Sequence, residues 1–424
     1  MIQNTLSLSA EPHPSETLKA WLLQQGLDGT SRSDVLQGYC QRLVDLGIPL
    51  MRVHVAQRAY NPQFGGIGFD WLRKSGMSHQ HYERTELPVK QWLSSPMFHL
   101  LETDQQEYRE RMTQTGHHSR FPLLNTLKTD GATDYFATGL LFEKRKPEEK
   151  IDPLDAPEGV LISWTSDGTN GFSDGDLDLI RSVNPYLGLV LKSSSNRQMA
   201  RDLLSVYLGR DAGRRVLSGE IQRGSSQQVN AVICYFDLTG FTELAEQTPG
   251  QDLIDMLNEY FAVAVSVIQE NGGNILKFMG DGMLTMFNLE TIESATDAAL
   301  EAATTLRQQI AALNQQREQD GLPTTGFTLA LHAGDILYGN IGAENRLDFT
   351  VIGPAVNLTA RLSGMHRTIG QNIIVSDKIF AASRSGRYDL VSLGRYMLRG
   401  ISEPQELYTV YQRAGSKDQA SSKP

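Results

Sequence analysis

Apolar and polar residues follow two different periods along this chain, and the change between them is clearest from residue 232 to residue 287. Residues 232–236 are apolar, aromatic or β-branched, which predicts a buried strand, and a carboxylate, Asp237, follows directly. Between 251 and 271 the apolar residues recur at helical spacing, which predicts a helix with one face in a core. A Gly-Gly stop, a strand, a Gly-Asp-Gly turn and a second strand at 283–287 come next.

The alternation of helices and strands continues towards residue 412. Residues 292 to about 320, rich in Ala and Gln, predict a second long helix, and 326–332 predict a strand. We expect a turn into the next strand within 335–341, and a strand at 373–375 that ends in a helix cap at Ser376. This order predicts an α/β (α+β) sandwich of ferredoxin-like type that contains antiparallel strands.

The first half of the chain carries a different order of patterns. Helices are predicted at 15–25, where Ser15 is the N-cap and Gly26 the stop, and at 34–46. Strand-forming residues occupy three further segments: 48–57, 133–143 and 159–165. A long helix follows from about residue 172. This arrangement resembles a GAF-like sensory domain; a PAS-type fold and a dimerisation domain without a ligand are the alternatives.

The segment that connects the two halves carries a stripe of apolar residues between Leu187 and Tyr207. Such a stripe is a packing face, and in a two-domain chain it favours a parallel dimer helix that couples the domains. Residues 222–228 are polar and contain Gly and Ser, which places the boundary there. The predicted parts are a disordered N-terminus (1–14), a GAF-like regulatory domain (15–192), a helical linker (193–228), a catalytic domain (229–412) and a disordered tail (413–424).

Composition narrows the class of protein. A length of 424 residues fits two domains and a connector, and a net charge of −10 argues against nucleic acid or an anionic membrane as a main partner. No run of 18 apolar residues occurs, and the N-terminus lacks the basic start and apolar core of a signal peptide. The two cysteines, Cys40 and Cys234, are expected to be free thiols in a reducing cytosol, so we expect a cytoplasmic protein.

Two carboxylates are candidates for a metal site. Asp237 follows one predicted strand and Asp281 lies in the turn before another, so they converge if the two strands are neighbours. Facing carboxylates suit Mg²⁺ that carries substrate phosphates, with the Leu238 carbonyl as an extra ligand. Three backbone N–H groups at the following helix start suit phosphate oxygens: those of Gly240, Phe241 and Thr242.

Two further motifs lie downstream. Asn357 and Arg361 are four residues apart in Asp-Phe-Thr-Val-Ile-Gly-Pro-Ala-Val-Asn-Leu-Thr-Ala-Arg-Leu, so on a helix they share a face. The segment Gly-Arg-Tyr-Met-Leu-Arg-Gly-Ile at 394–401 then precedes Glu-Leu-Tyr. Together with the two Asp motifs, in this order and spacing, these segments resemble the catalytic domain of class III nucleotidyl cyclases over roughly residues 230–412.

The resemblance implies a reaction in which the ribose 3′-hydroxyl attacks the α-phosphate of a nucleoside triphosphate and expels pyrophosphate. It assigns Asp237 and Asp281 to two Mg²⁺ or Mn²⁺ ions per site. Asn357 then orients the ribose and Arg361 steadies the phosphate. Arg399 resembles in position a cationic residue near the end of the family's catalytic domain that contacts phosphate. The alternative is that Arg399 is a solvated surface charge.

The resemblance also implies a base preference. Lys277, four residues before Asp281, and Thr350, seven before Asn357, stand at the family's base-reading positions, where guanylate cyclases typically carry Glu and Cys. A Lys donor for N1 and an acceptor for the N6 amino group favour adenine, hence ATP. Thr350 stands where Asp is commoner in the family, and in this the chain resembles the class IIIb subgroup. Members of that subgroup often respond to bicarbonate, so bicarbonate is a candidate regulator.

In this family the metal-binding and base-reading residues act from opposite subunits. All of them occur in this one chain, so a homodimer with two composite sites is expected, with a small-molecule or protein regulator at the N-terminal domain. Guanylate cyclase is one alternative. Diguanylate cyclase is another, disfavoured because Gly-Gly-Asp-Glu-Phe is absent. A catalytically dormant cyclase-like sensor is a third, disfavoured by the intact Asp pair.

Overall fold

The computed structural model describes residues 13–142, 151–154 and 157–413. The segments expected to be disordered, 1–14 and 413–424, fall almost wholly outside these residues. Contacts within the chain divide it into two compact units, Met1–Leu203 and Leu204–Pro424. Each unit has its own hydrophobic core.

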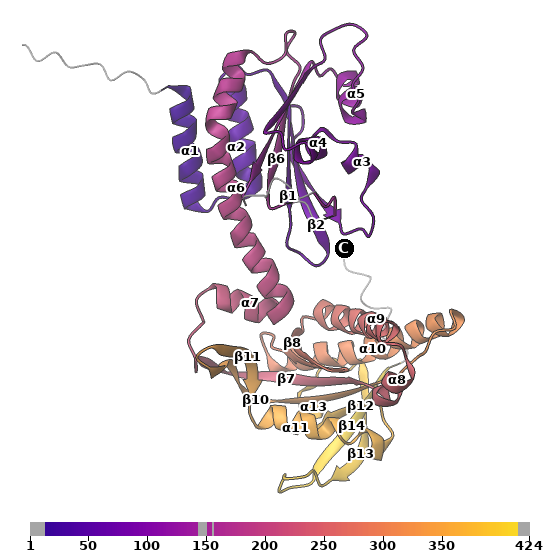
Figure 1. The fold of residues 1–424 in the computed structure, drawn as a ribbon. Helices are drawn as coiled ribbons and strands as arrows, with labels where there is room; N and C mark the ends of the chain where they lie inside the picture. Colours follow the sequence, from indigo (N-terminus) through magenta and orange to yellow (C-terminus); the bar gives the residue numbers. More distant parts are fainter. Residues whose placement is uncertain (1–12, 143–150, 155–156, 414–424) are drawn as a thin grey trace, which may run out of the picture. The chain divides into compact units, whose positions relative to one another are not determined.

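The first unit is built on an antiparallel sheet in the order β3-β2-β1-β6-β5-β4. Its strands are β1 Leu50–Arg58, β2 Phe64–Leu72, β3 Gly76–Glu83, β4 Glu107–Arg111, β5 Asp134–Leu141 and β6 Gly159–Ser166. Its helices are α1 Pro14–Asp28, α2 Arg32–Asp45, α3 Lys90–Leu93, α4 Pro96–Glu102, α5 Pro122–Thr129 and α6 Asp174–Leu208. Figure 1 shows α1, α2 and α6 on one side of the sheet and α3, α4 and α5 on the other. This architecture is consistent with a sensory domain, and the GAF assignment stays a prediction.

Two helices of this unit differ from the sequence expectation. The predicted stop at Gly26 is wrong: α1 continues to Asp28 and ends at Gly29, whose φ of 68° is the left-handed conformation that glycine adopts at helix ends. Gly26 lies inside the helix, and its missing side chain lets Val190 of α6 pack closely, since a Cβ there would lie 3.2 Å from Cγ2 of Val190. The long terminal helix, α6, passes through Pro185 without ending.

The second unit contains an eight-stranded mixed sheet, in the order β13-β14-β12-β10-β7-β9-β8, with β11 paired to β10. The strands are β7 Ser226–Leu238, β8 Asn274–Met279, β9 Gly282–Phe287, β10 Phe327–Ala343, β11 Arg346–Ile352, β12 Ile373–Ser376, β13 Tyr388–Tyr396 and β14 Gln405–Gln412. The helices are α7 Arg210–Leu217, α8 Phe241–Gln247, α9 Gly250–Glu270, α10 Ile292–Gln319, α11 Pro354–Ser363, α12 His366–Ile369 and α13 Asp377–Ala382. The predicted α+β class is confirmed.

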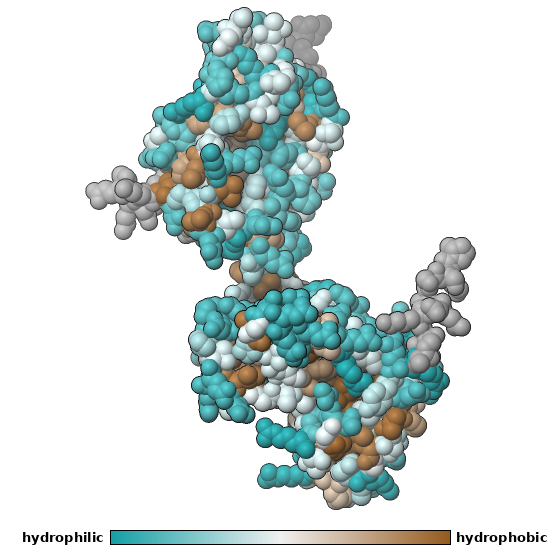
Figure 2. Space-filling view, turned by 90° about the vertical axis from the view of Figure 1, so that its right-hand side faces the viewer, coloured by the Kyte–Doolittle hydropathy of each residue, from teal (hydrophilic) through white to brown (hydrophobic). Residues whose placement is uncertain are grey.

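Both faces of this sheet are covered, and β7 runs through the middle. On one face Val232, Cys234 and Phe236 pack with α9 and α10. On the other face Ala231 and Ile233 pack with α7, α11 and the β10–β11 hairpin. Because residues 231–236 of β7 are covered on both faces, that part of the strand is an unbroken run of apolar and aromatic residues. The surface is mainly hydrophilic in the view of Figure 2, with hydrophobic residues in separate patches.

The turn expected within 335–341 is absent, and β10 is a single strand of 17 residues. Its register with β7 continues without a break from Phe327 to Gly339, so the ladder holds the segment extended. Two glycines in and beside this segment allow close approach of neighbouring groups. A Cβ on Gly339 would lie 2.1 Å from the Ser225 carbonyl oxygen, and one on Gly334 would lie 3.0 Å from the Ala355 Cβ.

Among the described residues, no helix has the length and apolarity needed to span a membrane.

Candidate active site

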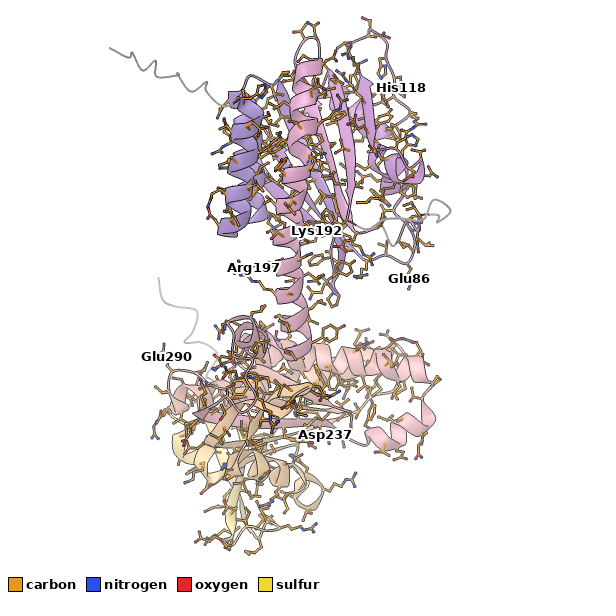
Figure 3. All side chains as sticks on the ribbon, turned by 60° about the vertical axis from the view of Figure 1, so that its left-hand side comes forward. Glu86, His118, Lys192, Arg197, Asp237 and Glu290 are labelled. Atoms are coloured by element: carbon orange, nitrogen blue, oxygen red, sulfur yellow. The ribbon has the colours of Figure 1, made fainter. Side chains whose placement is uncertain are left out.

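The ends of β7 and β9 bring the two predicted metal-binding carboxylates together. β7 and β9 are antiparallel neighbours, and Asp237 is the register partner of Gly282. The Leu238 N–H donates to the Asp281 carbonyl oxygen at 3.2 Å, which fixes the β8–β9 turn beside the end of β7. Figure 3 labels Asp237 among the side chains of the second unit.

The electrostatics of this pair suit a divalent cation. Burial, and then the negative charge of Asp281, raise the pKa of Asp237 to about 6. Two carboxylates that repel each other are stabilised by a cation between them, and oxygen ligands are those that Mg²⁺ prefers. Gly282 leaves room for this geometry, because a Cβ there would lie 2.8 Å from Oδ1 of Asp237. Among the described residues, no group of three or more His, Cys, Asp or Glu side chains is placed to hold a metal ion, so water and substrate oxygens would complete the coordination.

A helix start lies directly after Asp237. Gly240, with φ of 69°, is the N-cap of α8, and no side chain caps the first turn. The backbone N–H groups of a first helical turn lack acceptors within the helix, so those of Phe241 and Thr242 are suited to an anion.

Asn357 and Arg361 lie on one face of α11, as their spacing predicts. Asn357 is exposed and Arg361 is half-buried. The Arg361 Nη1 donates to the Gly400 carbonyl oxygen at 3.2 Å. The structure thus places Arg361 beside the loop that carries Arg399, whose side chain is exposed.

The two predicted base-reading residues are not joined directly. Lys277 lies on β8, and its Nζ is 3.0 Å from Oδ2 of Asp348 on β11. Thr350, two residues further along β11, is buried, and among the described residues no hydrogen bond joins it to Lys277. Sequence reasoning missed Asp348. The two-residue period of a strand, which puts 348 and 350 on the same face, could have indicated it.

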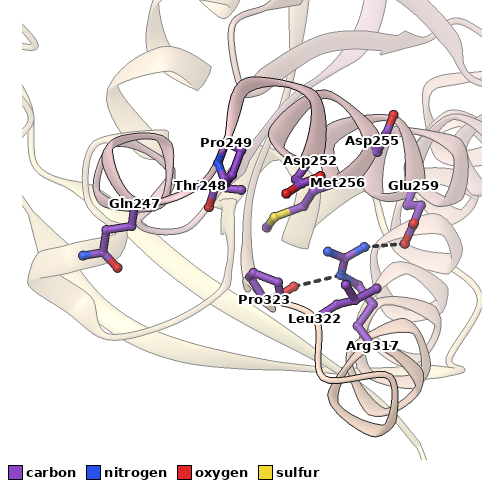
Figure 4. A pocket seen from close by; sticks show the side chains of 10 residues that line it. All are labelled: Gln247, Thr248, Pro249, Asp252, Asp255, Met256, Glu259, Arg317, Leu322 and Pro323. Carbon is purple, nitrogen blue, oxygen red and sulfur yellow. Dashed lines mark hydrogen bonds and ion pairs between the residues drawn. The ribbon is translucent and has the colours of Figure 1, made fainter.

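A separate cavity of about 320 Å³ lies where α8, α9 and the loop after α10 meet (Figure 4). Its lining includes Asp252, Asp255 and Met256. The buried Arg317 lies at one side, where its Nη1 is 2.5 Å from Oε2 of Glu259. None of the predicted site residues lines this cavity.

Comparison with known proteins agrees with this geometry. Residues 224–412 match the family described as the adenylate and guanylate cyclase catalytic domain. An uncharacterized protein of Mycobacterium tuberculosis is 30% identical over 220 residues, which are 51% of this chain and 38% of that protein. Adenylate cyclase 1 of Rhizobium meliloti is 24% identical over 257 residues, 59% of this chain and 38% of that protein. The adenylate cyclase of Anabaena cylindrica is 31% identical over 163 residues, 38% of this chain and 32% of its own length.

Among solved structures, the adenylyl cyclase CyaB from P. aeruginosa is 26% identical, with a TM-score of 0.42, and the match covers 45% of this chain and 97% of that one. The guanylyl cyclase Cya2 is 28% identical, with a TM-score of 0.40, and covers 46% and 97%. Residues 224–412 therefore form a class III nucleotidyl cyclase domain. The chain spans 38% of the length of the first curated relatives.

The raised pKa of Asp237 predicts a pH-dependent stability in metal-free protein. The folded state holds this proton more tightly than the unfolded state, whose pKa is near 3.8. Its contribution to stability is therefore present at low pH and is lost as pH rises through about 6. We expect the thermal midpoint of Asp237→Asn to exceed that of the wild type by more at about pH 7.5 than at about pH 4.5.

Saturating Mg²⁺ should reverse the difference, because the wild type gains a bound ion and the variant does not. Thermal scans at both pH values, with and without Mg²⁺, measure the two effects. If the difference in thermal midpoint between the variant and the wild type were the same at both pH values, the pKa of Asp237 would not be raised in the folded protein.

Proposed function

We propose that the catalytic domain converts ATP to 3′,5′-cyclic AMP and pyrophosphate. The observation that carries this proposal is the Asp237–Asp281 pair at the end of β7, in the same domain as the Asn357/Arg361 face of α11. The first pair suits metal-bound phosphates, and the second supplies an amide and a cation for the ribose and the α-phosphate. The dormant-sensor alternative requires the loss of one of these groups.

Each residue has a defined task in the proposed reaction. Asp237, Asp281 and the Leu238 carbonyl would hold two Mg²⁺ or Mn²⁺ ions, which would lower the pKa of the ribose 3′-hydroxyl and neutralise charge on the triphosphate. Asn357 orients the ribose by hydrogen bonding. Arg361, held by the Gly400 carbonyl, stabilises the negative charge that builds on the α-phosphate.

Other groups bind the rest of the nucleotide. The N–H groups of Gly240, Phe241 and Thr242 bind phosphate oxygens at the start of α8. Arg399, exposed on the loop that holds Arg361, is the candidate for a further phosphate contact. Lys277 donates to N1 of adenine and the Thr350 hydroxyl accepts from the N6 amino group, which favours ATP over GTP.

The proposed active species is a homodimer in which each site takes metal ligands from one subunit and base-reading residues from the other. Large apolar side chains are exposed next to the site segments: Phe278 is 53% exposed, Ile352 46% and Met397 62%. Contiguous patches of such side chains commonly mark protein interfaces.

Incubation of the purified full chain with Mg²⁺ or Mn²⁺ and either ATP or GTP tests the proposed activity. We expect cyclic AMP and pyrophosphate from ATP, identified by chromatography and mass spectrometry, and a kcat/KM for GTP at least about tenfold lower. Asp237→Ala should make neither product, because substrate phosphates lose their metal ligand. Cyclic GMP as the main product would contradict the adenine assignment, and no product with any metal would support a dormant sensor.

A mixing experiment tests the shared sites. Asp237→Ala and Asn357→Ala proteins should each be inactive, and their mixture should recover about a quarter of the wild-type rate if subunits exchange freely, because each heterodimer keeps one intact site. The matched control mixes Asp237→Ala with Asp281→Ala. These changes affect the same half of each site, so no activity should return. Recovery in the control, or none in the test, would argue against composite sites.

We propose also that the N-terminal unit regulates the cyclase. Near the division between the units, Leu208, Ala212 and Val216 pack on the catalytic sheet, so they belong to the catalytic core. A fragment of residues 204–424 keeps these three residues, whereas a fragment that starts at residue 225 lacks them.

We expect the rate of the 204–424 fragment at saturating ATP to differ from that of the full chain by about fivefold or more. Equal rates would contradict regulation by the first unit.

A further inference from the structure

The β10–β11 hairpin brings a carboxylate that the proposed reaction does not yet use to the base-reading lysine. Asp348 on β11 and Lys277 on β8 are 71 residues apart in sequence, and Oδ2 of one lies 3.0 Å from Nζ of the other. Their side chains are 59% and 37% exposed. An ion pair this exposed adds little to the stability of the fold, so its main consequence is where it holds the lysine.

The register of the hairpin explains why Asp348, and not Thr350, contacts the lysine. Asp348 pairs with Ile341 and Thr350 pairs with Gly339, so the two side chains point to the same face of β11. Thr350 is only 9% exposed, however, because the strand around it packs against the sheet. Asp348 lies nearer the tip of the hairpin, where its carboxylate reaches the ammonium group of Lys277.

The chemistry of the two acceptors differs. A threonine hydroxyl both donates and accepts, so it discriminates poorly between the N6 amino group of adenine and the O6 oxygen of guanine. A carboxylate only accepts, and it also holds a flexible lysine in one of its many side-chain conformations. A lysine held in this way presents its remaining donors to the base without the entropy cost of being ordered at each binding event.

We propose that Asp348 is a positioning residue that fixes the ammonium group of Lys277 for recognition of N1 of adenine, and that it thereby contributes to the choice of ATP over GTP. This inference rests on the proposed adenylate cyclase activity. Asp348 acts through Lys277, so its effect falls on nucleotide binding and on the ratio between the two nucleotides. Chemistry at the α-phosphate is left unchanged.

The test is Asp348→Asn, which keeps the shape of the side chain and removes its charge. We expect KM for ATP to rise about threefold, within the range that an exposed ion pair supplies, with kcat at saturating ATP essentially unchanged. The ratio of kcat/KM for ATP to that for GTP should fall. Asp348→Glu should restore most of the ratio. The matched control is Glu344→Gln at the tip of the same hairpin, an exposed carboxylate whose removal should change neither constant.

A double-mutant cycle separates positioning from a general effect of charge. In a Lys277→Gln background, Asp348→Asn should have no further effect on the ATP/GTP ratio, because the lysine it positions is gone. An unchanged ratio in Asp348→Asn, or the same loss with and without Lys277, would overturn the inference while leaving the proposed activity intact. A wild-type protein that makes no cyclic AMP would overturn both.

Discussion

The catalytic domain depends on one constraint: β7 is buried on both faces, and it carries a carboxylate near its end. β7 supplies side chains to both packed layers of the domain, so its position is set by the burial of its apolar residues on either side. Asp237 is half-buried near the end of β7, one residue before the buried Leu238. The hydrophobic core therefore holds the carboxylate in a half-buried position that a surface loop could not define.

The same constraint accounts for the electrostatics of the site. β9 pairs with β7 up to the register of Asp237 with Gly282, and this pairing puts the Asp281 turn next to a second carboxylate. Burial, and then the resulting repulsion, raise the pKa of Asp237. A pair that is unfavourable when both groups are ionised gains most from a divalent cation, so the pairing of the sheet gives the proposed metal site its electrostatic basis.

Local signals made the centre of the site predictable from the sequence. The apolar run before Asp237 and the Gly-Asp-Gly turn at Asp281 each define a short element. They come together because the second strand of the β8–β9 hairpin pairs with β7. The spacing of Asn357 and Arg361 is likewise a property of one helix. The two-residue period of a strand could have placed Asp348 on the same face as Thr350, but its contact with Lys277 depends on how far the β10–β11 hairpin extends, which no local pattern gives. The turn predicted within 335–341 would have ended β10 too early, so the length of the hairpin was not predicted. A sequence pattern does not distinguish a glycine that allows close packing from a glycine that makes a turn.

The hairpin and the linker meet the same strand, and this links substrate recognition to the rest of the chain. Gly209, between α6 and α7, has φ of 84°, and a Cβ on it would lie 2.6 Å from the carbonyl oxygen of Ile275 on β8. Ile275 is two residues before Lys277, so the end of the linker touches the strand that carries the base-reading lysine. The candidate metal ligands lie on β7 and in the β8–β9 turn. The segment 208–216 packs both on the strand that carries the candidate base-reading lysine and on β7, so it contacts the two strands that carry Lys277 and Asp237.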